Sequence, residues 1–327
     1  MISTPLVSVV TPVYNGADFL AECIDSVLRQ THPNWSMAIV DNASTDATPD
    51  IASRYASRES RIRHVRYDDF LPAVNDSINR ALTSTDPASD WCKMVLADDW
   101  IYPECLERML AVGEDQTNVG VVSSYQRWGD RVHLTHLPYN KNVVEGPTVL
   151  GRTFLYDENV TGNPTALMFR AQIIREQNPF YDRRLNHADT DAAYRTLVDH
   201  DLGFVHQVLS FARRQGGTNI DRSDRIGSAI AENLLSVVRY GPAVMDDASF
   251  GKALRMHLRR YSRYLAIQSL RPSRHNDAPY IGYHRRLLAI LGEDARSRDR
   301  GLKVLRSLGA ASLFPLPGTR QRLLGSD

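Results

Sequence analysis

The sequence predicts an α/β fold, a mostly parallel sheet with helices on both faces, followed by a C-terminal helical extension. Three observations predict it: short apolar runs in the first hundred residues, amphipathic helical segments between them, and helical periodicity after about residue 227. Strands that alternate with helices pair in parallel through right-handed crossovers. With 327 residues, 43% of them apolar and 24% charged, the chain is long enough for one large domain or two smaller ones.

The expected elements follow from the spacing of the apolar residues. We expect strands at 6–10, ended by Thr11-Pro12, and at 35–40, 62–67, 91–97, 119–124, 165–169 and 203–211. We expect helices at 17–30, 49–57, 73–83, 103–109, 188–200, 230–238, 254–270 and 283–291, and a loop-rich stretch at 127–149. A change in composition near 222–227 predicts a domain 1–222, with halves 1–99 and 100–222, and a helical region 223–327.

The charge is small overall but uneven. The formal net charge is +1, yet residues 251–327 hold 16 Lys or Arg and 5 Asp or Glu. This asymmetry predicts an anionic partner or surface for the C-terminal part, without an overall attraction to nucleic acid. Three cysteines at unrelated spacings fit a reducing compartment, and neither a signal peptide nor a spanning segment is recognisable, so we expect a cytoplasmic protein.

Two adjacent carboxylates, Asp98 and Asp99, end the apolar run Met94–Ala97. Open α/β sheets place ligands at the carboxyl ends of their strands, and two neighbouring charges there repel unless a cation binds them. A divalent metal that carries a diphosphate would do so. The alternative is a solvated turn, or an N-cap for the helix expected at 103–109.

The loops after the first two strands offer groups that suit a nucleotide. Tyr14 either stacks on a base or covers the hydrophobic layer. Asp41 and Asn42 suit a base edge or ribose hydroxyls, whereas the residues after them, Ser44 to Asp46, suit the capping of the next helix.

Four segments together resemble family 2 glycosyltransferases, which have the GT-A fold: VSVVTPVYNG (7–16), VDNASTD (40–46), NDSI (75–78) and LADD (96–99). The resemblance is strong over residues 6–110 and weaker to about 220. It implies inverting transfer of a hexosyl or N-acetylhexosaminyl group from a nucleotide-diphosphate sugar, with a UDP-sugar favoured. The acceptor would be a hydroxyl of a glycan or lipid-linked saccharide, in polysaccharide or cell-surface glycan synthesis.

The resemblance also implies site residues. Pro12, Tyr14, Asp41 and Asn42 match nucleotide-contacting positions. Asp98 and Asp99 match the family's metal motif, with Asp99 as the direct ligand of Mn²⁺ or Mg²⁺ shared with the diphosphate. In its nucleotide and metal motifs this chain departs from the family in two places. Asn42 stands where many members have aspartate, which leaves the base open, and Leu96 stands where many have a further aspartate, which predicts one metal ion.

Inverting transfer also needs a general base for the acceptor hydroxyl. Asp189 matches the family's base position in its Glu-Asp-x-Asp pattern, although Ala188 replaces the glutamate. The alternative for Asp189 is an acid at a helix N-terminus. Asp191 is expected to pair with Arg195, and His187 is a weaker base candidate.

A basic segment at 211–219 resembles the family's segment over the donor diphosphate. Either Arg213 or Arg214 would clamp phosphate oxygens; the alternative is a solvated strand end. Residues 162–165 are expected to shape the acceptor pocket.

The arginines of 252–274 allow three interpretations. These are contact with an anionic membrane surface near a lipid-linked acceptor, packing on the catalytic domain with the basic side in water, and a homo-oligomer contact. The second is favoured, because no exposed Trp or Phe accompanies the basic residues.

Three functions compete with sugar transfer. A nucleotidyltransferase or a dinucleotide oxidoreductase would need a Gly-rich phosphate loop after the first strand, where Thr11–Gly16 stands. A non-catalytic relative that binds a nucleotide sugar or a partner protein is left open by Leu96 and Ala188.

Overall fold

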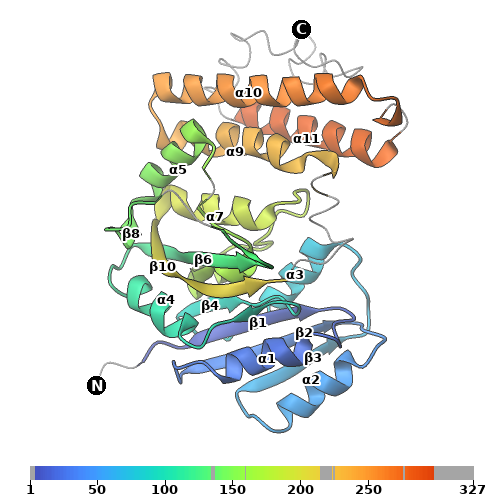
Figure 1. The fold of residues 1–327 in the computed structure, drawn as a ribbon, viewed down its shortest axis with the longest axis vertical. Coiled ribbons are helices and arrows are strands. Elements are labelled where there is room, and N and C mark those ends of the chain that lie inside the picture. The colour runs from blue at the N-terminus through green and yellow to red at the C-terminus, as the bar shows by residue number, and fades with distance from the viewer. Residues whose placement is uncertain are drawn as a thin grey trace. The chain divides into compact units, whose positions relative to one another are not determined.

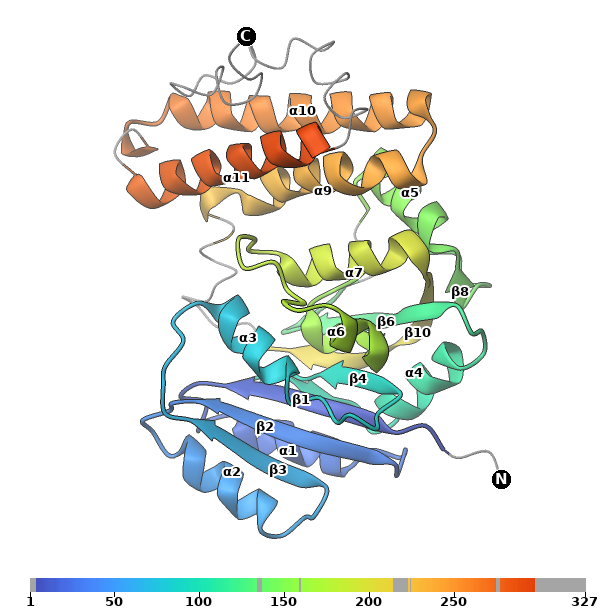
Figure 2. The ribbon, with the colours of Figure 1, turned by 180° about the vertical axis from the view of Figure 1, so that it is seen from behind.

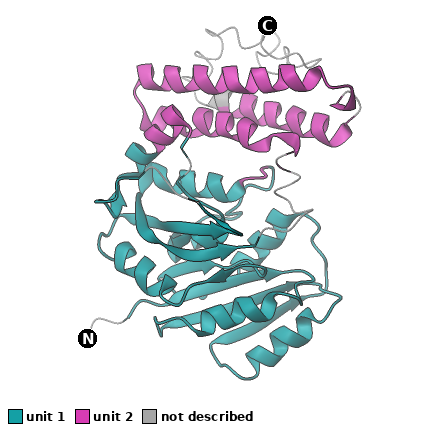
Figure 3. Cartoon of the chain, viewed as in Figure 1, with its two compact units in different colours: residues 1–149, 158–184, 188–214 teal, residues 150–157, 185–187, 215–327 magenta. Residues whose placement is uncertain are grey.

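The computed structural model describes residues 4–133, 137–158, 160–213, 223, 225–274 and 277–297. They form two compact units (Figure 3). The first comprises residues 1–149, 158–184 and 188–214, and the second comprises 150–157, 185–187 and 215–327. The helical unit therefore includes two short segments far from the C-terminal region in sequence.

The first unit contains one mixed, mostly parallel sheet with the strand order β3-β2-β1-β4-β9-β6-β10-β5. β1 pairs in parallel with β2 and β4, β2 with β3, and β6 with β10, while β9 is antiparallel to β4 and β6. The strands are β1 (Val7–Val13), β2 (Trp35–Asn42), β3 (Ile62–Tyr67), β4 (Trp91–Met94), β5 (Trp100–Ile101), β6 (Val119–Trp128), β7 (Arg131–His133), β8 (Val143–Val144), β9 (Met168–Arg170) and β10 (Asp201–Ala212).

Helices cover both faces of this sheet, as predicted. They are α1 (Leu20–Leu28), α2 (Thr48–Ala56), α3 (Val74–Leu82), α4 (Cys105–Gly113), α6 (Ala171–Glu176) and α7 (Ala188–Asp199), with a 3₁₀ turn, η1, at Pro164–Ala166. Figures 1 and 2 show α1, α2 and α4 on one face and α3, α6 and α7 on the other. The buried core between sheet and helices includes Trp35, Trp91 and Ile24.

β1 does not end at Thr11-Pro12 but continues to Val13 beside β2. β4 pairs with β1 only as far as Val10 opposite Met94. Pro12, which lacks a backbone N–H, therefore lies where one neighbouring strand has already ended, a place in a sheet that tolerates proline.

Three further expectations differ from the structure. Residues 165–167 lie in and after η1 rather than in a strand, and β4 ends at Met94 rather than at 97. The loop-rich stretch contains the start of an unpredicted helix, α5 (Gly146–Tyr156). Gly146 and Pro147 conceal it in the sequence, since both residues are poor in helix interiors although proline fits a first turn.

The second unit is built from three long helices, α9 (Ser228–Val244), α10 (Asp247–Ser269) and α11 (Ala278–Ser297), and α9 packs against the other two. α10 and α11 meet at His284, whose Nδ1 lies 2.8 Å from the Tyr261 hydroxyl and whose Nε2 lies 2.9 Å from the Ile226 carbonyl oxygen. Among the described residues, no helix is long and apolar enough to cross a membrane.

We expect His284 to make folding pH-dependent. Burial lowers the pKa of His284 from 6.5 to about 4, so the unfolded chain takes up a proton between these values and the folded chain does not. The free energy of unfolding therefore has its full value above pH 6.5 and falls by about 3 kcal/mol on acidification to pH 4. Urea unfolding across this range measures the loss. His284→Gln, which keeps a donor and an acceptor but does not titrate, should show less of it; equal pH dependence in both proteins would contradict the assignment.

Candidate functional site

The loops that follow β1 and β2 are joined by hydrogen bonds. The Asn15 N–H donates to Ser44 Oγ (2.9 Å), and the Thr45 N–H donates to Asn15 Oδ1 (2.8 Å). Asn15 has a φ of 49°, which an asparagine adopts more readily than most residues. As the sequence predicted, the carboxyl ends of neighbouring strands meet at one edge of the sheet.

Tyr14 lies at this edge and contacts Phe70, with ring centroids 4.4 Å apart and planes tilted by 37°. Both side chains are 47% exposed. Two half-exposed rings beside the ends of β1 and β2 leave aromatic surface on which a flat base can stack.

Asp41 is fully buried at the end of β2. Its Oδ1 accepts a hydrogen bond from the Ser44 N–H (2.9 Å), and its Oδ2 accepts one from Arg66 Nη1 (2.9 Å). Asp41 thereby fixes the loop that contacts Asn15.

Asn42 next to it holds another loop. Its Nδ2 donates to the Leu71 carbonyl (2.9 Å) and its Oδ1 accepts from the Leu71 N–H (3.1 Å) and from Arg80. The amide therefore joins β2 to the segment that carries Phe70.

Asp99 is held by three donors. Its Oδ2 accepts from Thr165 Oγ1 (2.6 Å) and Asn163 Nδ2 (3.2 Å), and its Oδ1 accepts from the Arg213 N–H (3.0 Å). A carboxylate oxygen accepts two hydrogen bonds, so Oδ2 is fully used. In the described part of the chain Oδ1 keeps one open acceptor position.

The electrostatics of this carboxylate favour a cation. Burial, with the neighbouring charge of Asp98 as a second cause, raises the pKa of Asp99 to about 7. Burial also raises the pKa of Asp98. Among the described residues no side chain hydrogen-bonds the Asp98 carboxylate.

This donor set fits a hard divalent cation, since two carboxylates supply oxygen ligands. The described residues include no group of three or more His, Cys, Asp or Glu placed to hold a metal by themselves. A metal here would therefore need ligands besides these carboxylates.

Arg213 lies directly beside the carboxylates. Its Nε donates to the Asp98 carbonyl oxygen (3.1 Å), its terminal nitrogen pairs with Glu22, and its guanidinium lies 4.4 Å from the centre of the Phe19 ring. The guanidinium thus hydrogen-bonds to neither the Asp98 nor the Asp99 carboxylate. Arg214, the other candidate for contact with the diphosphate, lies outside the described residues.

Asp189 lies in the first turn of α7. Burial raises the pKa of Tyr194 and of Tyr181, and the negative charge of Asp189 adds to this shift. Asp191 lies 3.6 Å from Arg195, which confirms the expected pair.

The residues that precede α7 are fixed by a glutamate that the sequence analysis missed. Glu232 of α9, which is buried, accepts from the N–H groups of Asn186 (2.9 Å) and His187 (2.8 Å) and from the Tyr283 hydroxyl (2.6 Å). The ring nitrogen Nε2 of His187 also lies 3.0 Å from Ser228 Oγ. Nothing in the sequence indicated these contacts, because Glu232 reads as an ordinary helix residue.

Asn163 and Thr165, which were expected to shape an acceptor pocket, both hydrogen-bond to Asp99. Gly162 before them has a φ of 74°, and a Cβ there would lie 2.8 Å from that of Ala166. The glycine is required for the tight turn that brings both side chains to the carboxylate.

The family model "Glycosyl transferase family 2" matches residues 8–177, just over half of the chain and most of the site described above. The chain belongs to this family. The predicted resemblance and the GT-A fold are confirmed.

Relatives of this family 2 chain match it in part. It is 52% identical over 78 residues to TuaG of Bacillus subtilis (24% of this chain, 31% of TuaG), and 31% identical over 150 residues to a PGL/p-HBAD biosynthesis glycosyltransferase of Mycobacterium bovis (43% and 57%). The chain thus spans between 31% and 57% of these relatives' lengths.

Solved structures share the fold at low sequence identity. S. aureus TarS 1-349 in complex with UDP-GlcNAc has a TM-score of 0.67 at 14% identity, over 97% of this chain and 88% of that one. The mannosyltransferase PcManGT from Pyrobaculum calidifontis, in complex with GDP-Man and Mn²⁺, has a TM-score of 0.55 at 18% identity, over 90% and 87%.

Proposed function

We propose that this protein is a metal-dependent, inverting glycosyltransferase that moves a sugar from a UDP-sugar to a hydroxyl of a glycan or lipid-linked saccharide. The observation that carries the proposal is Asp99, a buried carboxylate held by three donors with one acceptor position open at the edge of the sheet. TuaG, named for teichuronic acid biosynthesis, and TarS with UDP-GlcNAc support a role in polysaccharide synthesis and a uridine donor.

The donor would bind along the edge where the strands end. Tyr14 and Phe70 offer a stacking surface for the base, and Asp41 and Asn42 fix the loops around it. Pro12 shapes the backbone that leads to Tyr14. Asp99 and Asp98 would hold Mn²⁺ or Mg²⁺, which, when bound, neutralises charge on the leaving diphosphate. Arg213, with Arg214 as the alternative, adds positive charge beside it.

In the reaction, the acceptor oxygen attacks the anomeric carbon from the side opposite the diphosphate. The new C–O bond forms as the bond to the diphosphate oxygen breaks, which inverts the anomeric centre and releases the nucleoside diphosphate. Asp189 accepts the proton of the acceptor hydroxyl. Its place in the first turn of a helix favours the ionised carboxylate that a base must be.

Thermal denaturation with nucleoside diphosphates tests this proposal. A ligand that binds only the folded state raises the free energy of unfolding by about 2.7 kcal/mol when its concentration is about 100 times its Kd. UDP with Mn²⁺ should therefore raise the melting temperature by several degrees. UDP without metal should raise it much less, and the Asp99→Asn variant should show no metal effect. Equal shifts with and without Mn²⁺, or no shift with any nucleotide, would argue against the proposal.

The sequence favoured a basic side in water, but the exposed side of α10 also carries apolar residues, and on this observation we propose peripheral contact with an anionic membrane surface. Lys252, Arg255, Arg259 and Arg263 are exposed at helical spacing, with the apolar Met256, Ile267 and Leu270 also exposed. Each basic residue near such a surface contributes about 1 kcal/mol.

Sedimentation with vesicles checks this contact. Binding to phosphatidylglycerol-containing vesicles should exceed binding to phosphatidylcholine vesicles by more than about tenfold, because several basic residues act together. Replacement of the four basic residues by glutamine should abolish the difference. Equal binding to both vesicles would instead favour a basic side that simply faces water.

A further inference from the structure

A lysine lies fully buried in the middle of the sheet. Lys93 is in β4, opposite Val9 of β1 and Met168 of β9, and its side chain is 0% exposed. Removing an ammonium group from water costs several kcal/mol, and an apolar side chain of similar size would serve stability as well or better. Packing alone therefore does not explain a lysine at this position.

Lys93 binds the backbone of one short segment. Its Nζ donates to the carbonyl oxygen of Thr165 (2.5 Å) and lies 3.3 Å from that of Leu167. Both residues lie at η1, which brings Asn163 and Thr165 to Asp99. The ammonium thus holds the backbone of the turn whose side chains hold the candidate metal ligand.

Thr165 transmits this contact to the site. Its hydroxyl accepts a hydrogen bond from the Leu96 N–H (3.2 Å) and donates to Asp99 Oδ2 (2.6 Å). Asn163 Nδ2 donates to the same oxygen. With Oδ2 used by these two donors, the open acceptor position of Asp99 is on Oδ1.

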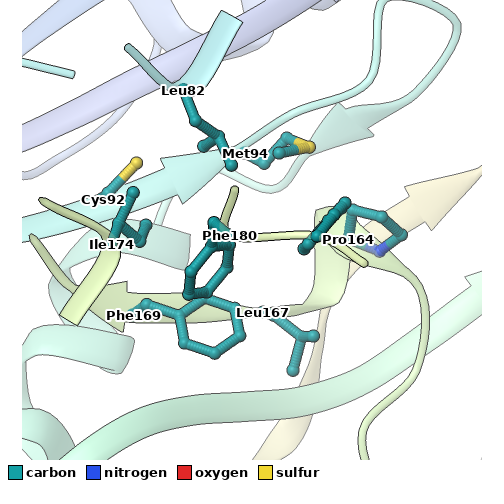
Figure 4. A pocket seen from close by; sticks show the side chains of 9 residues that line it. Leu82, Cys92, Met94, Pro164, Leu167, Phe169, Ile174 and Phe180 are labelled. Carbon is teal, nitrogen blue, oxygen red and sulfur yellow. The ribbon is translucent and has the colours of Figure 1, made fainter. Parts of the chain in front are cut away.

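The other side of the turn has few polar groups to hold it. Pro164 and Leu167 line a small pocket between β4, β9 and the helices α3 and α6, shown in Figure 4. The pocket is completed by Leu82, Cys92, Met94, Phe169, Ile174, Phe180 and Tyr181, none of them charged at neutral pH. Cys92 and Met94 point to this side, whereas Lys93, between them in the strand, points to the opposite face.

We propose that Lys93 is a positioning residue for the cation. It fixes η1 so that Thr165 and Asn163 occupy Oδ2 of Asp99 and leave Oδ1 for the metal. This inference rests on the proposed function, since it assumes a metal at Asp99. Lys93 thus affects the affinity for the metal although it touches neither the metal nor the substrate.

Mn²⁺ binding in the presence of UDP, measured by electron paramagnetic resonance on the full-length protein, tests the inference without reference to turnover. Lys93→Met keeps the length of the side chain but removes its donors and charge, and we expect Mn²⁺ binding to weaken by about 10- to 100-fold, as for other residues that orient metal ligands. Lys93→Gln, which retains a donor, should lose less.

Thr165→Val interrupts the same path on the other side of the turn and leaves Lys93 in place. It should weaken Mn²⁺ binding to a similar extent, and the double variant should be little worse than either single variant, because both act through one contact. Thr165→Val also tests the inference if Lys93→Met does not fold.

The outcomes separate the inference from the proposed function. If Asp99→Asn abolishes Mn²⁺ binding but the folded Lys93 and Thr165 variants bind Mn²⁺ like the wild type, the role of Lys93 is overturned and the metal site stands. A lower melting temperature with unchanged Mn²⁺ affinity would mark Lys93 as structural only. If the wild-type protein binds no Mn²⁺ with UDP, both proposals fall.

Discussion

The Asp189→Asn variant is expected to lose sugar transfer by about 10³-fold while its Mn²⁺-dependent binding of UDP stays within about twofold of the wild type. General-base catalysis contributes about 10²- to 10⁴-fold, and an amide of the same shape cannot accept the proton of the acceptor hydroxyl. Transfer from a radiolabelled UDP-sugar and calorimetry with UDP measure the two quantities separately.

Asp191→Asn provides the matched control for Asp189. It lies on the same helix turn and pairs with Arg195, so its replacement changes charge at nearly the same place without removing the proposed base. We expect this variant to keep transfer within about tenfold of the wild type, because weakening a partly buried ion pair costs little stability. Normal turnover in Asp189→Asn would remove Asp189 from the mechanism.

The Asp99→Asn variant is expected to weaken Mn²⁺ binding by at least about 100-fold and to reduce transfer to a similar or greater extent. The amide carries no charge and binds a hard cation poorly, and its NH₂ group cannot accept a hydrogen bond at whichever of the two oxygen positions it takes. Titration of Mn²⁺ in the presence of UDP gives the affinity, and transfer assays over a range of Mn²⁺ give the dependence.

Asp98→Asn is the comparison for this variant. The Asp98 carboxylate is less buried and is not held by the turn at η1, so its replacement should weaken Mn²⁺ binding less than the change at Asp99. Transfer that persists in Asp99→Asn with the same metal dependence would show that the cation binds elsewhere.

The strands and the loops around the nucleotide site were predictable because local sequence determines them. The apolar runs at Val7 and Trp35 mark parallel strands, and the polar residues that follow them must then meet at one edge. The placement of Asp99 followed from the same rule. The end of β1 was misjudged because Pro12 is tolerated only through the short length of its neighbour β4, which the sequence of β1 cannot show.

The contacts that hold the site were not predictable because they join distant parts of the chain. Thr165 reaches Asp99 because β9 inserts antiparallel between β4 and β6, and this strand order has no local sequence signal. Lys93 lies within an apolar run that reads as an ordinary strand. Glu232 follows Asn186 by 46 residues and contacts it only through the tertiary fold.

Crystals soaked with Mn²⁺ and UDP test the metal site most directly, through the anomalous scattering of manganese. The site described here predicts a single strong peak beside Oδ1 of Asp99, in contact with the diphosphate, and its loss in Asp99→Asn. A peak remote from both carboxylates, or UDP bound at the ends of β1 and β2 without manganese, would contradict it.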